Sequence, residues 1–590
     1  MYNRLIKLLS RTNRFTRSTV NTRLHIVVFR KRDFSDLSYI HNIGKEPLRP
    51  LTVGQLLEQT CFDHGNTTAV VSCHQDKRKT YSDILYEADR LAAGLMKMGF
   101  VQGESIGLWA PNQIEWYTSF LGCARAGLVV VSLNPAYQRR ELEYSINKVA
   151  LKGIICGHKF RKHNYYEILE SICPELNKNT PGHLRMKNMP SLRNIIMISE
   201  EKLGGSFNYN EVLNMPGEAE IEMVKKNQQK IGFDNPFNIQ LTSGTTGSPK
   251  AAVISHFSTV NNGYFAGKRN ELHKKHHTIC LQNPLFHAYG TIIALSASLN
   301  HGSTLVLPSD GFDPEKSLDA LREEDCTIIY GTPTMYVDLI NIQKRRKEAL
   351  NVEIALTGGA SCSPQLFEDM LQVLKVKKVK SVFGMSETTA SSFQSLEDDD
   401  KEKSTNTVGY LQEHLEAKVI DREGHIVPIG VPGELCIRGY TTMLGYYKDE
   451  EKTKKTIGSD GWLRTGDQFM LREDRYGRIL GRYQEMIIRG GENIYPKEIE
   501  DFLNTHPDIL EAQVIGLPNE RLGEEVCACL RTKDGRNFTV QELKGFCKGE
   551  IASFKIPTTI HIVEVFPTTA TGKIQKNELL QLILNKESNI

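Results

Sequence analysis

Short apolar runs alternate with amphipathic segments along most of the chain. The runs at residues 104–109, 150–156 and 303–307 are examples. Strands that alternate with helices in this way favour parallel sheets covered by helical layers. A chain of 590 residues is long enough for a large core and at least one satellite domain. We therefore expect an α/β fold whose large N-terminal domain consists of stacked, mostly parallel α/β layers.

The character of the sequence changes from about Asp467 onward. Short strand-like runs, turns and charged residues follow one another there, for example at Gly481-Arg482 and Gly490-Gly491. This pattern predicts a second, small α+β domain at the C-terminus, with its boundary near residues 482–485.

Composition narrows the class of protein. Hydrophobic residues make up 40% and charged residues 24% of the chain, as in an ordinary globular protein. No apolar run is long enough to span a membrane, so we expect no transmembrane segment. The net charge of +3 is too small to indicate a nucleic-acid partner. The 12 cysteines are scattered, and Cys527 and Cys529 share a probable strand, so we expect reduced, buried thiols.

The N-terminus differs from the rest of the chain. Arg and Lys recur from Arg4 to Arg32 with Ser and Thr between them, and no acidic residue precedes Asp33. This composition is typical of a mitochondrial transit peptide, and residues 32–35 resemble a processing site that leaves Ser35 first. We predict a transit peptide at residues 1–34 and a mitochondrial matrix location. A basic tail with no targeting role is the alternative.

We assign no function to three segments that are expected at the surface. The windows 178–191 and 397–403 are polar or charged and predict solvated loops. The cluster His273-Lys274-Lys275-His276-His277 suggests a metal site, but no cysteine or acid lies at ligand spacing on this segment. A solvated loop is the better interpretation.

A loop rich in glycine and hydroxyl groups gives the sharpest functional signal. Residues 241–250, LTSGTTGSPK, connect strand-like runs at 237–241 and 251–255. Glycines allow the backbone amides to point inward, hydroxyls add donors and Lys250 adds a charge, so the loop can enclose a polyphosphate. It is not a Walker A loop, because no Gly-Lys-Ser/Thr opens a helix. A flexible turn explains the composition but not the placement between two strands.

Other short motifs are weak when taken singly. A turn with one acid follows a strand-like run, a Gly-Gly turn ends another, and His287 lies on an apolar stretch where a core histidine is the ordinary interpretation. The segments are PLFHA at 284–288, TGGA at 357–360, FGMSET at 383–388, TGD at 465–467, Gly481-Arg482 and PTTATGK at 567–573.

Together and in this order, the motifs resemble those of the adenylate-forming superfamily, which includes acyl-CoA synthetases, luciferases and peptide-synthetase adenylation domains. The resemblance covers nearly the whole chain after residue 34. It implies that Mg–ATP and a carboxylic acid bind in the large domain. The implied ATP/AMP-binding residues are Thr242, Ser243, Gly244, Thr245, Thr246, Gly247, Lys250, Gly358, Gly359, Ala360, Phe383, Gly384, Ser386, Asp467, Arg482 and Lys573.

The resemblance also implies a catalytic set. Glu387 would hold Mg²⁺, since a single carboxylate is sufficient for a Mg–ATP complex. His287 would lie near the acyl carbonyl. Lys573 would bridge the attacking carboxylate and the α-phosphate, which neutralises the charge that keeps two anions apart. Phe383 and Ser386 replace the more usual Tyr and Thr but retain the aromatic ring and the hydroxyl.

The second half-reaction, transfer of the acyl group to coenzyme A, is implied to need rotation of a mobile C-terminal domain. By resemblance, residues 35–483 form the adenylation domain, residues 484–590 form the lid domain, and the hinge is Gln484. Gly490 and Gly491 would contact coenzyme A. Most relatives carry Lys or Asp at the hinge, so Gln484 departs from the pattern.

The implied activity is an ATP-dependent acid–thiol ligase that acts on a fatty acid, with medium chain length suggested by the most similar members of the superfamily. An adenylate-forming enzyme with another acceptor is the nearest alternative. A catalytically silent nucleotide-binding protein is a third possibility, although Glu387, Lys573 and the whole phosphate loop are present.

Overall fold

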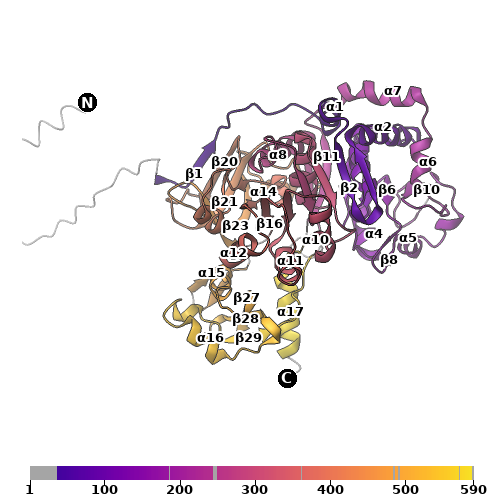
Figure 1. Cartoon of the computed structure of the whole chain (residues 1–590). Coiled ribbons are helices and arrows are strands. Elements are labelled where there is room, and N and C mark those ends of the chain that lie inside the picture. Colours follow the sequence, from indigo (N-terminus) through magenta and orange to yellow (C-terminus); the bar gives the residue numbers. More distant parts are fainter. Residues whose placement is uncertain are drawn as a thin grey trace, which may run out of the picture. The chain divides into compact units, whose positions relative to one another are not determined.

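Two helix-covered sheets form most of the structure (Figure 1). The computed structural model describes residues 36–184, 186–242, 249–359, 362–482, 485–489, 492–569 and 572–587. The transit peptide predicted at residues 1–34 lies outside these ranges. Within them, no helix is both long and apolar enough to cross a membrane. The predicted α/β class is confirmed.

The first sheet carries the two strands that flank the glycine-rich loop. Its central strands are parallel, but the last two pairings, β11 with β12 and β12 with β22, are antiparallel. In spatial order the strands are β10 (Phe207–Asn208), β9 (Asn194–Met197), β6 (Gly153–Cys156), β4 (Ser105–Trp109), β5 (Val129–Ser132), β11 (Pro236–Thr242), β12 (Lys250–Ser255) and β22 (Gly445–Tyr446).

The second sheet is parallel from β17 to β2 and antiparallel at both edges. Its parallel strands end near the motifs at 357–360 and 383–388. In spatial order they are β19 (Tyr410–Leu411), β18 (Phe393–Gln394), β17 (Lys378–Phe383), β16 (Ile354–Gly358), β15 (Ile328–Gly331), β13 (Thr278–Leu281), β14 (Thr304–Leu307), β2 (Thr68–Ser72) and β3 (Lys77–Thr80).

The structure also contains two smaller sheets. One is antiparallel and comprises β1 (Tyr39–Asn42), β20 (Leu415–Ile420), β21 (Gly433–Gly439), β23 (Leu463–Leu471) and β24 (Gly477–Arg482). The other comprises β26 (Glu492–Ile494), β25 (Ile487–Arg489), β28 (Gly523–Thr532), β27 (Ile509–Asn519) and β29 (Thr559–Ile562). Sheet membership thus changes between Arg482 and Ile487, which supports the boundary proposed near residue 484. A separate hairpin pairs β7 (Lys159–Phe160) with β8 (His163–Asn164).

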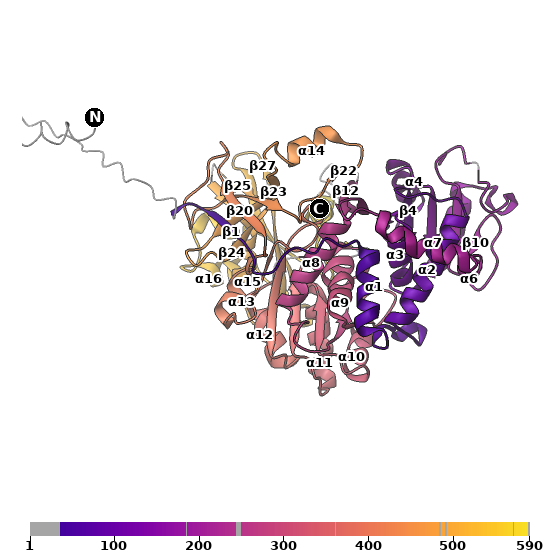
Figure 2. The ribbon, with the colours of Figure 1, turned by 90° about the horizontal axis from the view of Figure 1, so that it is seen from above.

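Helices cover the sheets with their apolar faces inward. In α2, Ile84, Ala88, Leu91 and Leu95 recur at helical spacing and are buried, and Thr80 caps the first turn. Figure 2 shows α8 and α9 beside α1. The N-terminal helices are α1 (Val53–His64), α2 (Tyr81–Lys97), α3 (Ile114–Arg125), α4 (Arg139–Lys148), α5 (Tyr165–Ile172), α6 (Tyr209–Asn214), α7 (Glu218–Asn227), α8 (His256–Arg269) and α9 (Ala297–His301). The others are α10 (Pro314–Glu323), α11 (Pro333–Arg346), α12 (Pro364–Val373), α13 (Lys401–Asn406), α14 (Glu450–Thr456), α15 (Pro496–Leu503), α16 (Val540–Cys547) and α17 (Lys576–Glu587).

Two predictions for surface segments need correction in part. The window 178–191 buries Leu184, Met186 and Met189, because these apolar side chains pack into the core under the first sheet. In the histidine cluster, His277 is buried and its Nδ1 lies 2.9 Å from the hydroxyl of Thr327, whereas His273 and His276 are exposed. Cys527 and Cys529 are buried on β28.

Candidate active site

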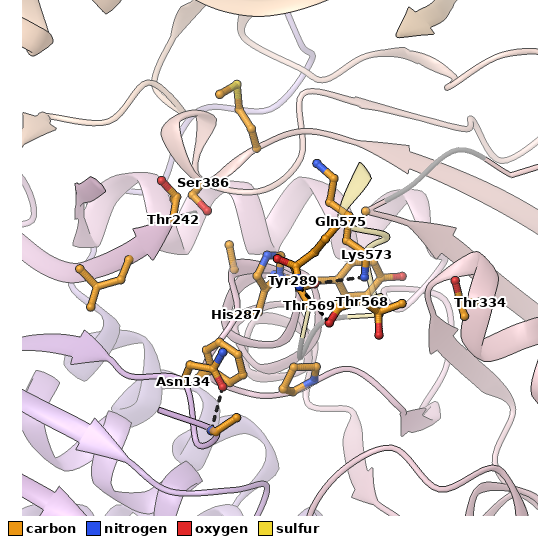
Figure 3. Close-up of a pocket in the computed structure, with 18 of the residues that line it drawn as sticks. Asn134, Thr242, His287, Tyr289, Thr334, Ser386, Thr568, Thr569, Lys573 and Gln575 are labelled. Atoms are coloured by element: carbon orange, nitrogen blue, oxygen red, sulfur yellow. Dashed lines mark hydrogen bonds between the residues drawn. The ribbon is translucent and has the colours of Figure 1, made fainter. Parts of the chain in front are cut away.

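A cavity of about 1460 Å³ lies at the carboxyl ends of β11, β16 and β17. Thr242 ends β11, Gly359 follows β16 and Gly384 follows β17, and all three line the cavity. Ligands of α/β proteins commonly bind at this edge of a sheet, because the connecting loops converge there. Figure 3 shows side chains from distant segments around the cavity, including Thr242, His287, Ser386 and Lys573.

The two ends of the phosphate loop are held close together. Thr242 and Lys250 are directly paired across the β11–β12 ladder, and both line the cavity. The Thr242 hydroxyl is buried and has no hydrogen-bond partner among the described residues. An unsatisfied donor at this position suits a phosphate oxygen. The loop residues Ser243, Gly244, Thr245, Thr246 and Gly247 lie outside the described residues.

A 3₁₀ turn after β17, Ser386–Thr388, carries the acid of the FGMSET motif. Glu387 is only 6% exposed, and its Oε1 accepts a hydrogen bond of 2.8 Å from the Tyr446 hydroxyl. Both Ser386 and Glu387 line the cavity. Gly384 admits no side chain, because a Cβ there would lie 1.9 Å from the carbonyl oxygen of Ala390.

A second cavity of about 660 Å³ adjoins the first. The two share Gly359, Gly384, Arg482 and Lys573 in their walls. The second cavity is also lined by Gly358, Phe383 and Asp467, the remaining described residues of the predicted nucleotide site. Ala360 lies outside the described residues. The described residues of the predicted nucleotide site are therefore divided between the walls of two adjoining cavities.

Asp467 and Arg482 face each other across β23 and β24. Their backbones are paired in the ladder, and Arg482 Nε lies 3.2 Å from Asp467 Oδ1. Burial raises the pKa of the Asp467 carboxyl, and the charges of Arg482 and Lys573 oppose that change. A buried carboxylate with a second oxygen available can accept bonds from a pair of sugar hydroxyls.

Lys573 lies on a tight turn that packs against the start of α11. Gly572 has a φ of +78°, and a Cβ there would approach the Thr332 hydroxyl to 2.8 Å, so both the turn and its close packing favour glycine. Burial lowers the pKa of the Lys573 ammonium, and the charge of Arg482 adds to that effect. A nearby anion would therefore favour the protonated, charged form of Lys573.

His287 is neutral in this environment. Burial, with a contribution from the Lys573 charge, lowers its pKa to about 4. The backbone N–H of Tyr289 donates to His287 Nδ1 at 3.2 Å, so the ring proton resides on Nε2. His287 can therefore donate one hydrogen bond from Nε2, and it carries no charge near neutral pH.

The site includes one residue that the motifs do not mark. Tyr446 touches Glu387 although the two lie 59 positions apart, and the Gly445-Tyr446 pair belongs to none of the motifs identified in the sequence. The predicted hinge residue Gln484 and the predicted coenzyme A contacts Gly490 and Gly491 lie outside the described residues.

Glu387 fits the magnesium ion that the motifs imply. Its carboxylate is nearly buried beside Ser386 in the cavity wall, and carboxylate oxygens are hard ligands suited to Mg²⁺. Such an ion commonly takes one or two carboxylates together with phosphate oxygens and water. Within the described part of the chain, no group of at least three His, Cys, Asp or Glu side chains could hold a metal ion.

Comparison with known proteins agrees with this arrangement. Residues 57–447 match the AMP-binding enzyme family, and residues 498–573 match the C-terminal domain of AMP-binding enzymes. The chain is 41% identical over 545 residues to the mitochondrial medium-chain acyl-CoA ligase ACSF2 of Danio rerio, covering 92% of this chain and 90% of that protein. It is 39% identical over 549 residues to the human ACSF2 ligase, covering 92% and 89%.

Solved structures share the fold. The anthranilate CoA ligase AuaEII in complex with anthranoyl-AMP superposes with a TM-score of 0.81 at 24% identity, over 92% of this chain and 99% of that one. ATP-bound MatB from Rhodopseudomonas palustris gives a TM-score of 0.76 at 23% identity, over 90% and 99%.

Proposed function

The chain belongs to the AMP-binding enzyme family, and from this premise we propose that it is an ATP-dependent acyl-CoA ligase for medium-chain fatty acids. It forms an acyl-adenylate from the acid and ATP, and then transfers the acyl group to coenzyme A. One observation carries the proposal: Thr242, Glu387, Asp467 and Lys573, from four separate segments, line two adjoining cavities. The ACSF2 relatives, which are named medium-chain acyl-CoA ligases, supply the substrate class.

In the first step, a carboxylate oxygen of the fatty acid attacks the α-phosphorus of ATP. The bond to the β-phosphate breaks, and pyrophosphate leaves. Both reactants are anions, so positive charge and donors are needed where they meet. Lys573 supplies a charge, while Thr242 and Lys250 hold phosphate oxygens. Glu387 would hold a magnesium ion, which would screen further phosphate charge.

Asp467 and His287 bind and orient the substrates. Asp467 holds the ribose hydroxyls, and Arg482 fixes the orientation of that carboxylate at 3.2 Å. Phe383 and the glycines at 358 and 359 line the adenine side. His287 donates from Nε2 toward the acyl carboxylate, and its low pKa keeps the ring uncharged near neutral pH.

In the second step, the thiolate sulfur of coenzyme A attacks the acyl carbonyl carbon, and AMP leaves as the C–O bond breaks. We place this step in a second conformation, in which residues 484–590 rotate about Gln484 and withdraw Lys573. The change of sheet membership between Arg482 and Ile487 supports a hinge there. Gly490 and Gly491 would then contact coenzyme A.

The protein is assigned to the mitochondrion, in line with the names of its ACSF2 relatives. We propose the matrix as the compartment, because the leader at residues 1–34 is basic and free of acids up to Asp33.

Pyrophosphate release tests the proposed function. Purified protein with Mg–ATP and octanoate should release pyrophosphate, and addition of coenzyme A should convert all the acyl-AMP to the thioester. Acids of increasing chain length should show a maximum at medium length. No pyrophosphate with any acid would favour a silent nucleotide-binding protein. Pyrophosphate without thioester would favour a different acyl acceptor.

A further inference from the structure

The segment Met443–Tyr447 joins the two parts of the site that handle phosphate and metal. Its backbone forms a hydrogen bond with each part. The N–H of Met443 donates to the Glu387 carbonyl at 2.9 Å, and the N–H of Tyr447 donates to the Ala251 carbonyl at 2.9 Å. Ala251 follows Lys250 on β12, the strand that leaves the phosphate loop. The segment therefore spans the short distance between that strand and the turn that carries Glu387.

The Tyr446 side chain also contacts both the turn that carries Glu387 and the strand that begins at Lys250. It is 6% exposed, and its hydroxyl donates to Glu387 Oε1 at 2.8 Å. The ring lies 5.6 Å from Nζ of Lys250, within the range of a cation–π contact. Nζ of Lys452 lies 5.9 Å from the same ring. A single aromatic residue thus contacts both the carboxylate proposed for Mg²⁺ and the lysine proposed for phosphate.

The geometry gives Glu387 a fixed orientation. Hydrogen bonds to a charged acceptor are short and directional, so the Tyr446 hydroxyl holds one carboxylate oxygen in place. Among the described residues, the other oxygen of Glu387 has no donor. Burial and the Glu387 charge raise the pKa of the Tyr446 hydroxyl, so it remains a donor throughout the physiological pH range.

We propose that Tyr446 is a positioning residue. It orients Glu387 toward the metal of Mg–ATP and holds that carboxylate at a fixed position relative to Lys250. This inference rests on the proposed function, in which Glu387 binds the metal. In this assignment Tyr446 acts through the Glu387 carboxylate, to which its hydroxyl is bonded. Its effect should therefore appear in metal affinity rather than in the rate at saturating metal.

The test compares two neighbouring variants, Tyr446→Phe and Tyr447→Phe. Each removes one oxygen, but no contact joins Tyr447 to Glu387 in the described structure. The first readout is binding of Mn²⁺ in the presence of ATP and without any acid, followed by electron paramagnetic resonance. The second is the Mg²⁺ concentration that gives half-maximal pyrophosphate release with octanoate.

Tyr446→Phe should weaken Mn²⁺ binding and raise the half-maximal Mg²⁺ concentration by about tenfold, the effect of losing one hydrogen bond to a charged group. The rate at saturating Mg²⁺ should stay within about twofold, and Tyr447→Phe should change neither readout. In a Glu387→Gln background, the further change Tyr446→Phe should have no additional effect on Mn²⁺ binding.

Several results would overturn the proposal. One is an unchanged Mn²⁺ affinity in Tyr446→Phe. Another is a fall in rate at saturating Mg²⁺ with no change in metal dependence. Loss of cooperative folding in Tyr446→Phe would assign the residue to the core instead. If the unmodified protein itself binds no Mn²⁺ with ATP, the proposed function fails together with this inference.

Discussion

Lys573 is the residue whose charge the proposed first step uses most directly. Replacing it with alanine should lower acyl-adenylate formation by about 10²–10³-fold, the usual cost of removing a group that stabilises transition-state charge. Thioester formation from added acyl-AMP should be retained, because the second step proceeds with Lys573 withdrawn. ATP–pyrophosphate exchange measures the first step, and thioester yield from synthetic octanoyl-AMP measures the second.

Lys586→Ala is the matched control for Lys573→Ala. Lys586 is an exposed lysine on the same C-terminal part of the chain, at the end of α17. It should leave both half-reactions unchanged. If Lys573→Ala slows both half-reactions equally, the assignment of this lysine to the first step is wrong.

Single residues also show where sequence reasoning succeeds and where it stops. Glu387 and Lys573 lie inside short motifs, so their position in the chain identifies them. Tyr446 lies 59 positions from its partner Glu387, and the pairing of β22 with β12 and the Met443 N–H bond to the Glu387 carbonyl bring the two together. The tautomer of His287 depends on one backbone N–H, that of Tyr289, which no residue pattern reveals.

At the scale of elements, His256 joins two helices in the core. It is the first residue of α8 and is 1% exposed, and its Nδ1 accepts the N–H of Val53, the first residue of α1, at 3.2 Å. Its ring stacks on Phe237 with centroids 4.5 Å apart. Burial lowers the pKa of His256 to about 3, because a charged imidazole cannot be solvated there.

This burial predicts a loss of stability in acid. An unfolded histidine titrates near pH 6.5, so the contribution of neutral His256 is complete above that pH. It declines as the pH falls from about 6.5 toward 3, by up to several kcal/mol in total. His256→Asn cannot titrate, so its urea midpoint should fall less steeply over this range than that of the unmodified protein.

His425→Asn, in an exposed turn, is the matched control for His256→Asn. Its urea midpoint should follow that of the unmodified protein at every pH. A parallel decline in all three proteins would mean that the acid sensitivity arises elsewhere.

Elements were easier to predict than their pairing. The strand-like runs at 237–241 and 251–255 correspond to β11 and β12. Their antiparallel arrangement inside a mainly parallel sheet was not predictable, because a seven-residue connection at 243–249 allows a hairpin but does not require it. The burial of Leu184, Met186 and Met189 was also not predictable from the sequence. A mainly polar window can carry single apolar side chains that pack into a hydrophobic core.

For the whole molecule, the central question is what holds the C-terminal sheet in the position that brings Lys573 to the cavity. Arg531 on β28 lies 3.1 Å from Asp338 on α11, and therefore bridges the two proposed domains. Arg531 also lies 3.6 Å from Glu511 on β27. Burial raises the pKa of Glu511 to about 7, with Asp338 adding to the effect, so near neutral pH Glu511 competes only partly for Arg531.

Asp338→Asn should weaken this bridge while keeping the size of the side chain. A partly exposed ion pair contributes below about 1 kcal/mol, so the population with Lys573 in place should fall by at most about fivefold. Acyl-adenylate formation should slow by up to that factor, whereas thioester formation from added octanoyl-AMP should be unchanged or faster. The control is Asp319→Asn, which breaks a comparable pair with Arg346 within the large domain. Slower thioester formation in Asp338→Asn, or equal effects in the two variants, would show that Arg531 and Asp338 do not control the exchange between the two half-reactions.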